Sequence, residues 1–253
     1  MIIFYAGYLS DHKNELKDFW KGFVKPMCFL VPPIAILYFV QNHLSVSLVI
    51  GIISCVMMLM AGCRLVHFMG AGLTGVAGVA LLLIKGQSSE SSSFRLDRIM
   101  TFFDPWADAT GTGYQMVQSL YAIGSGGLFG VGLGNSKQKC LYIPEPQNDF
   151  IFAIVAEELG FVGCVAIIAL FAIFVWRGIV ISMKAPDMFG SLLAVGITTL
   201  VAVQAIINIA VVTASIPTTG MALPFFSYGG TALVILLASV GILLNISRAG
   251  SKV

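Results

Sequence analysis

The stretch DFIFAIVAEELGFVGCVAIIALFAIFVW, residues 149–176, decides the fold. After Asp149, the run from 150 to 176 contains two charged side chains, Glu157 and Glu158. About 20 consecutive apolar residues are enough for a helix to cross the hydrocarbon core of a bilayer. The stretch therefore predicts a membrane-spanning helix with one carboxylate at its start and two more inside it.

Further apolar runs of about this length lie at residues 26–41, 45–62, 66–84, 189–213 and 224–245. The chain of 253 residues is 58% hydrophobic and 10% charged, whereas an average globular protein is about 25% charged. We therefore expect an all-α fold, a polytopic membrane helix bundle with about six complete spans and a helix stub before them. We expect residues 1–253 to form one membrane domain. The net charge of +2, with scattered cations, does not favour a nucleic-acid partner.

The cations between the runs predict the orientation of the bundle. If the spans alternate across the membrane, one face receives Lys13, Lys17, Lys21, Lys25, Arg64, Arg177, Lys184, Arg248 and Lys252. The positive-inside rule makes that face cytoplasmic, so we expect the C-terminus there. The opposite, extracellular face then carries one long loop, residues 85–149.

A loop of that length is usually either functional or disordered, and the aromatic side chains in residues 85–149 argue against general disorder. Residues 87–93 are of low complexity, and we expect them to be flexible. Asp104 and Pro105 predict a turn.

A short amphipathic helix is expected after this turn. Its N-cap candidates are Thr110 and Thr112. Its apolar face carries Tyr114, Val117, Leu120 and Tyr121. We expect the helix to lie on the outer membrane surface, where lipid covers an apolar stripe.

The glycine-rich run GSGGLFGVGLGNSKQK, residues 124–139, has two interpretations. It lacks the GxxxxGK[ST] pattern and a preceding soluble strand, so a nucleotide-binding loop is not favoured. An ordinary flexible loop is one alternative. The other is a backbone that approaches its neighbours closely, with Lys137, Gln138 and Lys139 placed to bind an anionic group.

The carboxylates also have two interpretations each. Asp149 either caps the following helix or accepts a proton at the membrane surface, and Glu145 is a candidate to share that second role. A carboxylate inside a span, such as Glu157 or Glu158, is costly unless it finds a partner or a wet cavity. An ion pair of at least one of them with Arg177 or Lys184 is the simpler interpretation.

Polar and helix-breaking residues near the end of the run 189–213 and after it predict a cavity wall. Irregular backbone at membrane depth persists only where it lines protein or water, and Asn208 either lines a polar seam or bonds one helix to another. The predicted wall residues are Asn208, Pro217, Pro224, Ser227, Gly229 and Gly230.

Four long motifs, at residues 104–139, 144–163, 207–234 and 241–248, together resemble the SEDS (shape, elongation, division and sporulation) family, closest to its FtsW/SpoVE branch. Members have about ten spans, so the chain is expected to be the C-terminal part of that fold. The resemblance implies a peptidoglycan glycosyltransferase that polymerises lipid II at the outer face of the bacterial plasma membrane. It also implies a class B penicillin-binding transpeptidase and other divisome proteins as partners.

In that family the aspartate of the DFIFA motif is taken as catalytic, and it corresponds to Asp149. A pyrophosphate leaves without protonation, so one carboxylate base suffices for an inverting displacement, whereas glycoside hydrolysis usually needs two. Fixed cations or a divalent metal, Mg²⁺ or Mn²⁺, would balance the charge on the leaving group. The candidate substrate-binding residues are Arg95, Arg98, Lys137, Gln138, Lys139 and Glu145.

Two other functions stay open. A flippase for the same lipid-linked sugar would use Glu157, Glu158 and the broken outer segments as a path. A non-catalytic scaffold for the transpeptidase is the third possibility. The residues do not decide between division, sporulation and elongation, nor whether a metal is required.

Overall fold

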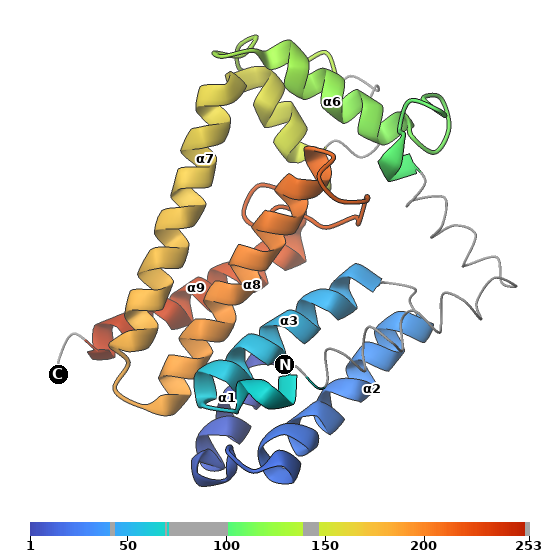
Figure 1. The fold of residues 1–253 in the computed structure, drawn as a ribbon. Helices are drawn as coiled ribbons and strands as arrows, with labels where there is room; N and C mark the ends of the chain where they lie inside the picture. Colours follow the sequence, from blue (N-terminus) through green and yellow to red (C-terminus); the bar gives the residue numbers. More distant parts are fainter. Residues whose placement is uncertain (41–43, 69, 71–100, 139–146, 251–253) are drawn as a thin grey trace, which may run out of the picture. The chain divides into compact units, whose positions relative to one another are not determined.

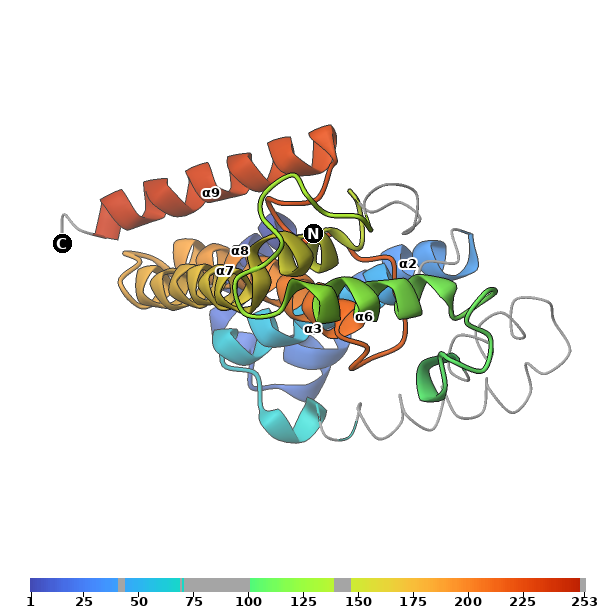
Figure 2. The same cartoon turned by 90° about the horizontal axis from the view of Figure 1, so that it is seen from above.

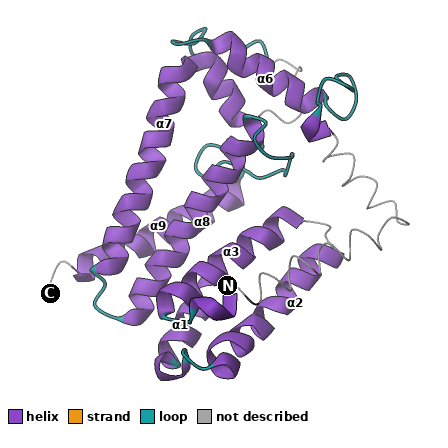
Figure 3. Ribbon diagram, viewed as in Figure 1, coloured by secondary structure: helices purple, strands orange, loops and turns teal. Residues whose placement is uncertain are grey.

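The structure is a computed structural model that describes residues 1–40, 44–68, 70, 101–138 and 147–250. Helices are the regular elements of these residues, and none of them forms a strand (Figure 3). The elements are α1 (Ile2–Asp11), a 3₁₀ turn (Lys13–Glu15), a π-helix (Phe19–Val24), α2 (Lys25–Phe39), α3 (Leu44–Ala61), α6 (Tyr114–Gly126), α7 (Ile151–Met183), α8 (Met188–Val212) and α9 (Gly230–Gly250). This confirms the all-α prediction for the described part of the chain.

Helices long and apolar enough to cross a membrane occupy Phe19–Tyr38, Ile151–Met183, Met188–Val212 and Gly230–Gly250, and Ser45–Ala61 is a shorter apolar helix. These correspond to five of the six predicted runs. The run 66–84 lies largely outside the described residues, as does the flexible segment predicted at 87–93. The first span begins at Phe19, earlier than predicted, because a π-helical turn leads directly into α2.

The chain divides into two compact units. The first unit contains residues 1–78, 173–203 and 234–253, and the second contains residues 79–172 and 204–233. In the first unit, α1 packs on α3, and the buried hydroxyl of Tyr5 donates to the main-chain oxygen of Pro26 at 2.6 Å. This bond ties α1 to the start of α2.

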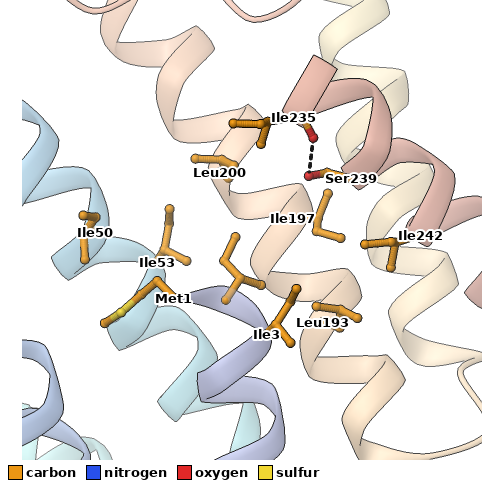
Figure 4. Close-up of a pocket in the computed structure, with 11 residues that line it drawn as sticks. Met1, Ile3, Ile50, Ile53, Leu193, Ile197, Leu200, Ile235, Ser239 and Ile242 are labelled. Carbon is orange, nitrogen blue, oxygen red and sulfur yellow. Dashed lines mark hydrogen bonds between the residues drawn. The ribbon is translucent and has the colours of Figure 1, made fainter. Parts of the chain in front are cut away.

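The first unit also holds a pocket of about 290 Å³ (Figure 4). Its lining is aliphatic apart from Met1 and Ser239, and the Ser239 hydroxyl already bonds the main-chain oxygen of Ile235 at 2.8 Å. None of the predicted site residues lines it. The pocket therefore offers no group for acid–base chemistry.

The core of the second unit forms where the start of α7 meets α6 and the end of α8. It consists of Ala122, Phe150, Phe152, Ala153, Ile154, Ile167, Ala205, Val211, Val212 and Leu223. Helix α6 joins this core, and its Ser119 hydroxyl donates to the main-chain oxygen of Val212 at 2.8 Å. Small side chains on α6 allow this close packing.

The short helix predicted after the turn is present as α6, which begins at Tyr114. The residues of α6 that are buried within the protein are Met116, Val117, Ser119, Ala122 and Gly126. Tyr121 is 52% exposed, and its ring meets Trp106 edge-on at 5.5 Å. Packing against α7 and α8 therefore buries mainly small side chains of α6.

The turn before α6 is confirmed, but the predicted N-cap is not. Asp104 accepts hydrogen bonds from the main-chain nitrogens of Trp106 and Ala107 at 3.1 and 3.2 Å. The N-cap position of α6 is Gly113, after both Thr110 and Thr112, and no side chain there makes a capping bond. Thr112 instead donates its N–H to the carboxylate of Asp108 at 2.8 Å and its hydroxyl at 3.2 Å.

The pH dependence of this turn follows from its hydrogen bonds. The Thr112 N–H lowers the pKa of Asp108 below its ordinary value. The stabilisation is therefore complete above the ordinary pKa of about 3.9 and is lost as the pH falls through the lower, folded value. We expect Asp108→Asn to reduce the amide exchange protection of Thr112 at pH 7. At pH 2 the variant and the parent should match, and a difference that persists there would contradict the assignment.

Candidate active site

Asp149 lies in the turn that leads into α7, and the main chain around it is bound from elsewhere in the second unit. The carbonyl oxygen of Gln147 accepts from the N–H of Tyr228 at 2.8 Å. That of Asn148 accepts from the Ser227 hydroxyl at 2.5 Å. That of Asp149 itself accepts from Nδ2 of Asn208 at 2.7 Å. Three consecutive carbonyls are thus engaged by residues from α8 and from the segment that follows it.

That segment, residues 213–229, is non-helical and joins α8 to α9, as its prolines and glycines predicted. Ala214 and Phe225 adopt positive φ values of 53° and 67°, which are uncommon for residues other than glycine. Backbone conformations of this kind cost energy and cluster at functional sites. The segment is therefore a strained, well-anchored element.

Gly220 brings this segment next to the carboxylate of Asp149. Its φ is +63°, and a Cβ atom placed on it would lie 3.3 Å from Oδ2 of Asp149. The absence of a side chain lets the main chain lie directly beside the carboxylate. The carboxylate of Asp149 thus lies beside segment 213–229, where the sequence predicted a cavity wall.

The other residues predicted to form the cavity wall differ in burial and in where they lie relative to α9. Pro217 is half-buried, Pro224 is buried, and Gly229 lies just before α9. Gly230 is the first residue of α9, so the span predicted at 224–245 begins six residues later than expected and reaches Gly250. Gly230 therefore starts a helix and does not interrupt one.

Helix α7 is broken at Gly160, where φ is 66° and ψ is −166°. Figure 1 shows its two halves meeting at a sharp bend beside the end of α6, and Figure 2 shows the same bend from above. The first half, residues 151–159, runs from the Asp149 turn to the break. The sequence predicted one continuous span here, because an apolar run does not report the backbone angles within it.

The loop of residues 127–138 satisfies the main-chain groups that the break exposes. The N–H groups of Val131 and Gly132 donate to the carbonyls of Glu157 and Glu158 at 2.9 and 3.1 Å. In the other direction, the N–H groups of Phe161 and Val162 donate to the loop carbonyls of residues 127 and 128 at 2.9 and 3.1 Å. Both ends of the interrupted helix are thereby capped.

Glycine is required where this loop touches the break. A Cβ atom on Gly130 would lie 2.1 Å from the carbonyl oxygen of Glu158, and one on Gly160 would lie 2.3 Å from the nitrogen of Gly130. Of the two interpretations of the glycine-rich run, close approach of the backbone is therefore correct for residues 127–138. The loop is ordered by main-chain hydrogen bonds.

Glu157 is buried, with 2% of its surface exposed. Its carboxylate accepts hydrogen bonds from the hydroxyl of Ser136 and from the N–H groups of Lys137, at 3.0 Å, and Gln138, at 3.3 Å. Glu158 accepts a longer bond, 3.4 Å, from the N–H of Ser136. Loop donors therefore satisfy the carboxylate of Glu157, and an ion pair of at least one of the two glutamates with Arg177 or Lys184 stays a prediction.

The structure describes two of the candidate substrate-binding residues, Lys137 and Gln138. Lys137 presents an exposed side chain from the loop that Glu157 holds, and Gln138 is half-buried beside it. The remaining candidates, Arg95, Arg98, Lys139 and Glu145, lie outside the described residues. Among the residues that are described, no group of three or more His, Cys, Asp or Glu side chains could hold a metal ion.

Comparison with known proteins agrees with the helical fold. The family described as Cell cycle protein, with the members FtsW, RodA and SpoVE, matches residues 1–252. "Stage V sporulation protein E" of Bacillus subtilis (strain 168) is 47% identical over 248 residues, covering 98% of this chain and 66% of the relative. "Probable peptidoglycan glycosyltransferase FtsW" of Geobacter sp. (strain M18) is 41% identical over 247 residues, covering 98% and 65%.

Two solved structures share the fold. A chain of the structure described as "Structural coordination of polymerization and crosslinking by a peptidoglycan synthase complex" matches with a TM-score of 0.73 at 24% identity, over 90% of this chain and 62% of that one. The rod shape determining protein RodA of Thermus thermophilus matches with a TM-score of 0.60 at 25% identity, over 96% and 63%.

The fold and site define a helical membrane protein with an aspartate fixed where a span begins. The chain belongs to the Cell cycle protein family of FtsW, RodA and SpoVE, the SEDS family. It spans a little less than two thirds of the length of the curated relatives that it matches, 66% and 65% for the two named above.

The contacts of Glu157 predict a measurable role in holding the loop. In Glu157→Gln, the amide nitrogen cannot accept, so at least one of the three donors loses its partner. A buried donor without a partner costs about 1–3 kcal/mol. We expect a lower thermal unfolding midpoint and faster proteolysis within residues 127–138.

Glu158→Gln is the matched control, because Glu158 is less buried and its bond to the Ser136 nitrogen is longer. Its effect on both measurements should be clearly smaller. Equal effects of the two substitutions would show that the carboxylate of Glu157 does not hold the loop.

Proposed function

We propose that the protein is a peptidoglycan glycosyltransferase that polymerises lipid II into glycan strands, with Asp149 as its general base. The observation that carries the proposal is the fixed position of Asp149, whose neighbouring carbonyls are bound by Tyr228, Ser227 and Asn208. The names of the FtsW relatives support the reaction. The positive-inside pattern of the cations supports a site at the outer face of a bacterial plasma membrane.

In the proposed reaction, Asp149 accepts the proton of a sugar 4-hydroxyl as that oxygen attacks the anomeric carbon of the lipid-linked donor. The bond to undecaprenyl pyrophosphate breaks with inversion at that carbon. A base must come within hydrogen-bond reach of the proton that it removes. The anchored main chain and the adjacent Gly220 limit the places where the carboxylate can lie.

The leaving pyrophosphate needs positive charge near it. Lys137 offers an exposed ammonium group on an ordered loop, and Gln138 follows it. We assign Arg95, Arg98 and Lys139 to the same pyrophosphate contacts, and Glu145 to substrate contacts close to Asp149, as proposals from the sequence. A divalent cation, Mg²⁺ or Mn²⁺, remains an alternative source of that charge.

A class B penicillin-binding transpeptidase and further divisome proteins are the proposed partners. The related structure described as a peptidoglycan synthase complex supports such an assembly. A relative named for sporulation matches at 47% identity, and two relatives named FtsW match at 43% and 38%, so the proposed role is cell division or sporulation.

A flippase for the same lipid is the second candidate. The break in α7 at Gly160 and the non-helical segment 213–229 favour it, because discontinuous helices form the binding sites of many transporters. The two candidates differ in what Asp149 does. Only the glycosyltransferase requires a base there.

Asp149→Asn tests this difference. A general base contributes about 10²–10⁴-fold to a rate, so glycan-strand formation from labelled lipid II should fall by about that factor. The measurement uses the genomic full-length protein purified with its transpeptidase. Translocation of lipid II and binding of the partner should be unchanged, and polymer formation at the parent rate would reject Asp149 as the base.

Gly220→Ala tests the closeness of the segment to the carboxylate. The new methyl group would lie 3.3 Å from Oδ2 of Asp149 on a residue with φ of +63°. The contact requires the segment or the carboxylate to shift by a few tenths of an ångström, and alanine is strained at this φ, so we expect slower polymerisation. Gly124→Ala is the control, because that Cβ meets no atom within 4 Å, and equal activity of the two variants would contradict the geometry.

A further inference from the structure

Asp149 is attached to a main chain that is bound at three successive points. The partners of the carbonyls at 147, 148 and 149 lie 81, 79 and 59 residues further along the chain. One is a main-chain N–H, from Tyr228, and the other two are the side chains of Ser227 and Asn208. The side-chain partners can be removed by substitution without altering the main chain.

Asn208 joins two elements through one amide group. Its side chain is 1% exposed, and Nδ2 donates both to the Asp149 oxygen at 2.7 Å and to the Met221 oxygen at 2.6 Å. Both N–H bonds of the amide are used, as the chemistry of asparagine allows. The aspartate and the segment 213–229 are therefore tied to the same nitrogen on α8.

The oxygen of this amide is buried without a hydrogen-bond partner among the described residues. A buried acceptor without a partner costs free energy. Residues whose buried polar atoms lack a hydrogen-bond partner are expected mainly at functional sites. The amide nitrogen of Asn208 thus donates to the carbonyls of Asp149 and Met221, while the amide oxygen has no partner among the described residues. This pattern indicates that Asn208 serves to hold those two carbonyls in place.

Ser227 makes a second, independent tie. Its hydroxyl donates to the Asn148 oxygen at 2.5 Å and accepts from the N–H of Leu223 at 2.7 Å. The accepted bond closes the turn that contains Phe225, whose φ is 67°. The same hydroxyl therefore links this strained turn to Asn148, the residue before Asp149.

We propose that Asn208 and Ser227 are positioning residues that fix the main chain of Asp149 so that its carboxylate reaches the attacking hydroxyl. The proposal rests on the proposed function, in which Asp149 is the base. Neither residue needs to touch the substrate. Their contribution is orientation, which appears in the rate of the chemical step and not in substrate binding.

The test compares kcat and KM for labelled lipid II in Asn208→Ala, Ser227→Ala and Ser227→Thr, each in the full-length protein with its transpeptidase. We expect kcat to fall about 10- to 100-fold in the two alanine variants, with KM changed less than about twofold. Ser227→Thr keeps the hydroxyl and should recover most of the rate. Asn208→Asp should be at least as impaired as Asn208→Ala, because its carboxylate would face two carbonyl oxygens.

Ser119→Ala is the matched control. Ser119 is fully buried in the same unit, and its hydroxyl donates to a main-chain carbonyl, that of Val212, at 2.8 Å. It should lower the unfolding midpoint about as much as Ser227→Ala and leave kcat unchanged. If Ser227→Ala and Asn208→Ala lose no more kcat than Ser119→Ala, or if the loss lies in KM, the proposal is wrong.

Two further comparisons distinguish failure of the positioning role from a failure to fold and from failure of the proposed function. If Asn208→Ala does not fold, the pair Ser227→Ala and Ser227→Thr decides, because a positioning role requires recovery by threonine. If Asp149→Asn still polymerises, the proposed function fails. If Asp149→Asn is inactive while the alanine variants retain the parent kcat, the positioning role alone fails.

Discussion

The requirement that every buried main-chain N–H and C=O find a partner governs the second unit of this protein. In apolar surroundings an unsatisfied group costs several kcal/mol, so a helix can be interrupted only where other residues supply the missing bonds. The break at Gly160 meets this requirement through the loop 127–138, which caps both halves of α7. The carboxylate of Glu157 then binds the far end of the same loop.

The same constraint explains the candidate site. Where α7 begins, the carbonyls of its preceding turn accept hydrogen bonds from Asn208 on α8 and from the segment 213–229 that follows it. Hydrogen bonds thus join the turn before α7 to the segment 213–229, and Asp149 lies where the two meet. The first half of α7, nine residues with a rise of about 1.5 Å each, is consequently fixed at both ends.

Much of this architecture could be predicted from the residues, because hydropathy and helix breakers are local signals. The apolar runs marked the four helices long enough to cross a membrane and the shorter apolar helix Ser45–Ala61, and the prolines and glycines after Val212 marked the irregular segment next to Asp149. Asn208 was recognised as a polar residue in an apolar helix. Its partners were not predictable, since they are set by tertiary packing across 59 and 13 residues.

The errors have a common physical cause. Hydropathy does not report φ, so the break at Gly160 was missed, although a glutamate pair separated from that glycine only by Leu159, and a glycine-rich run earlier in the chain, were available signals. The residues of α6 that pack inside the protein were not predicted, because its large apolar residues were expected to face lipid. Close packing favoured Ser119, Ala122 and Gly126 instead.

The sequence separation between Asp149 and its anchors has a consequence for biosynthesis. A ribosome adds about 5–20 residues per second, so roughly 4 to 16 seconds pass between the synthesis of Asn148 and that of Ser227, 79 residues later. During that interval the stretch that becomes α7 can already be in the membrane while the turn before it has no anchor. The aspartate acquires its place only when the connection to the last described helix has emerged, so the nascent chain is membrane-embedded before its candidate site exists.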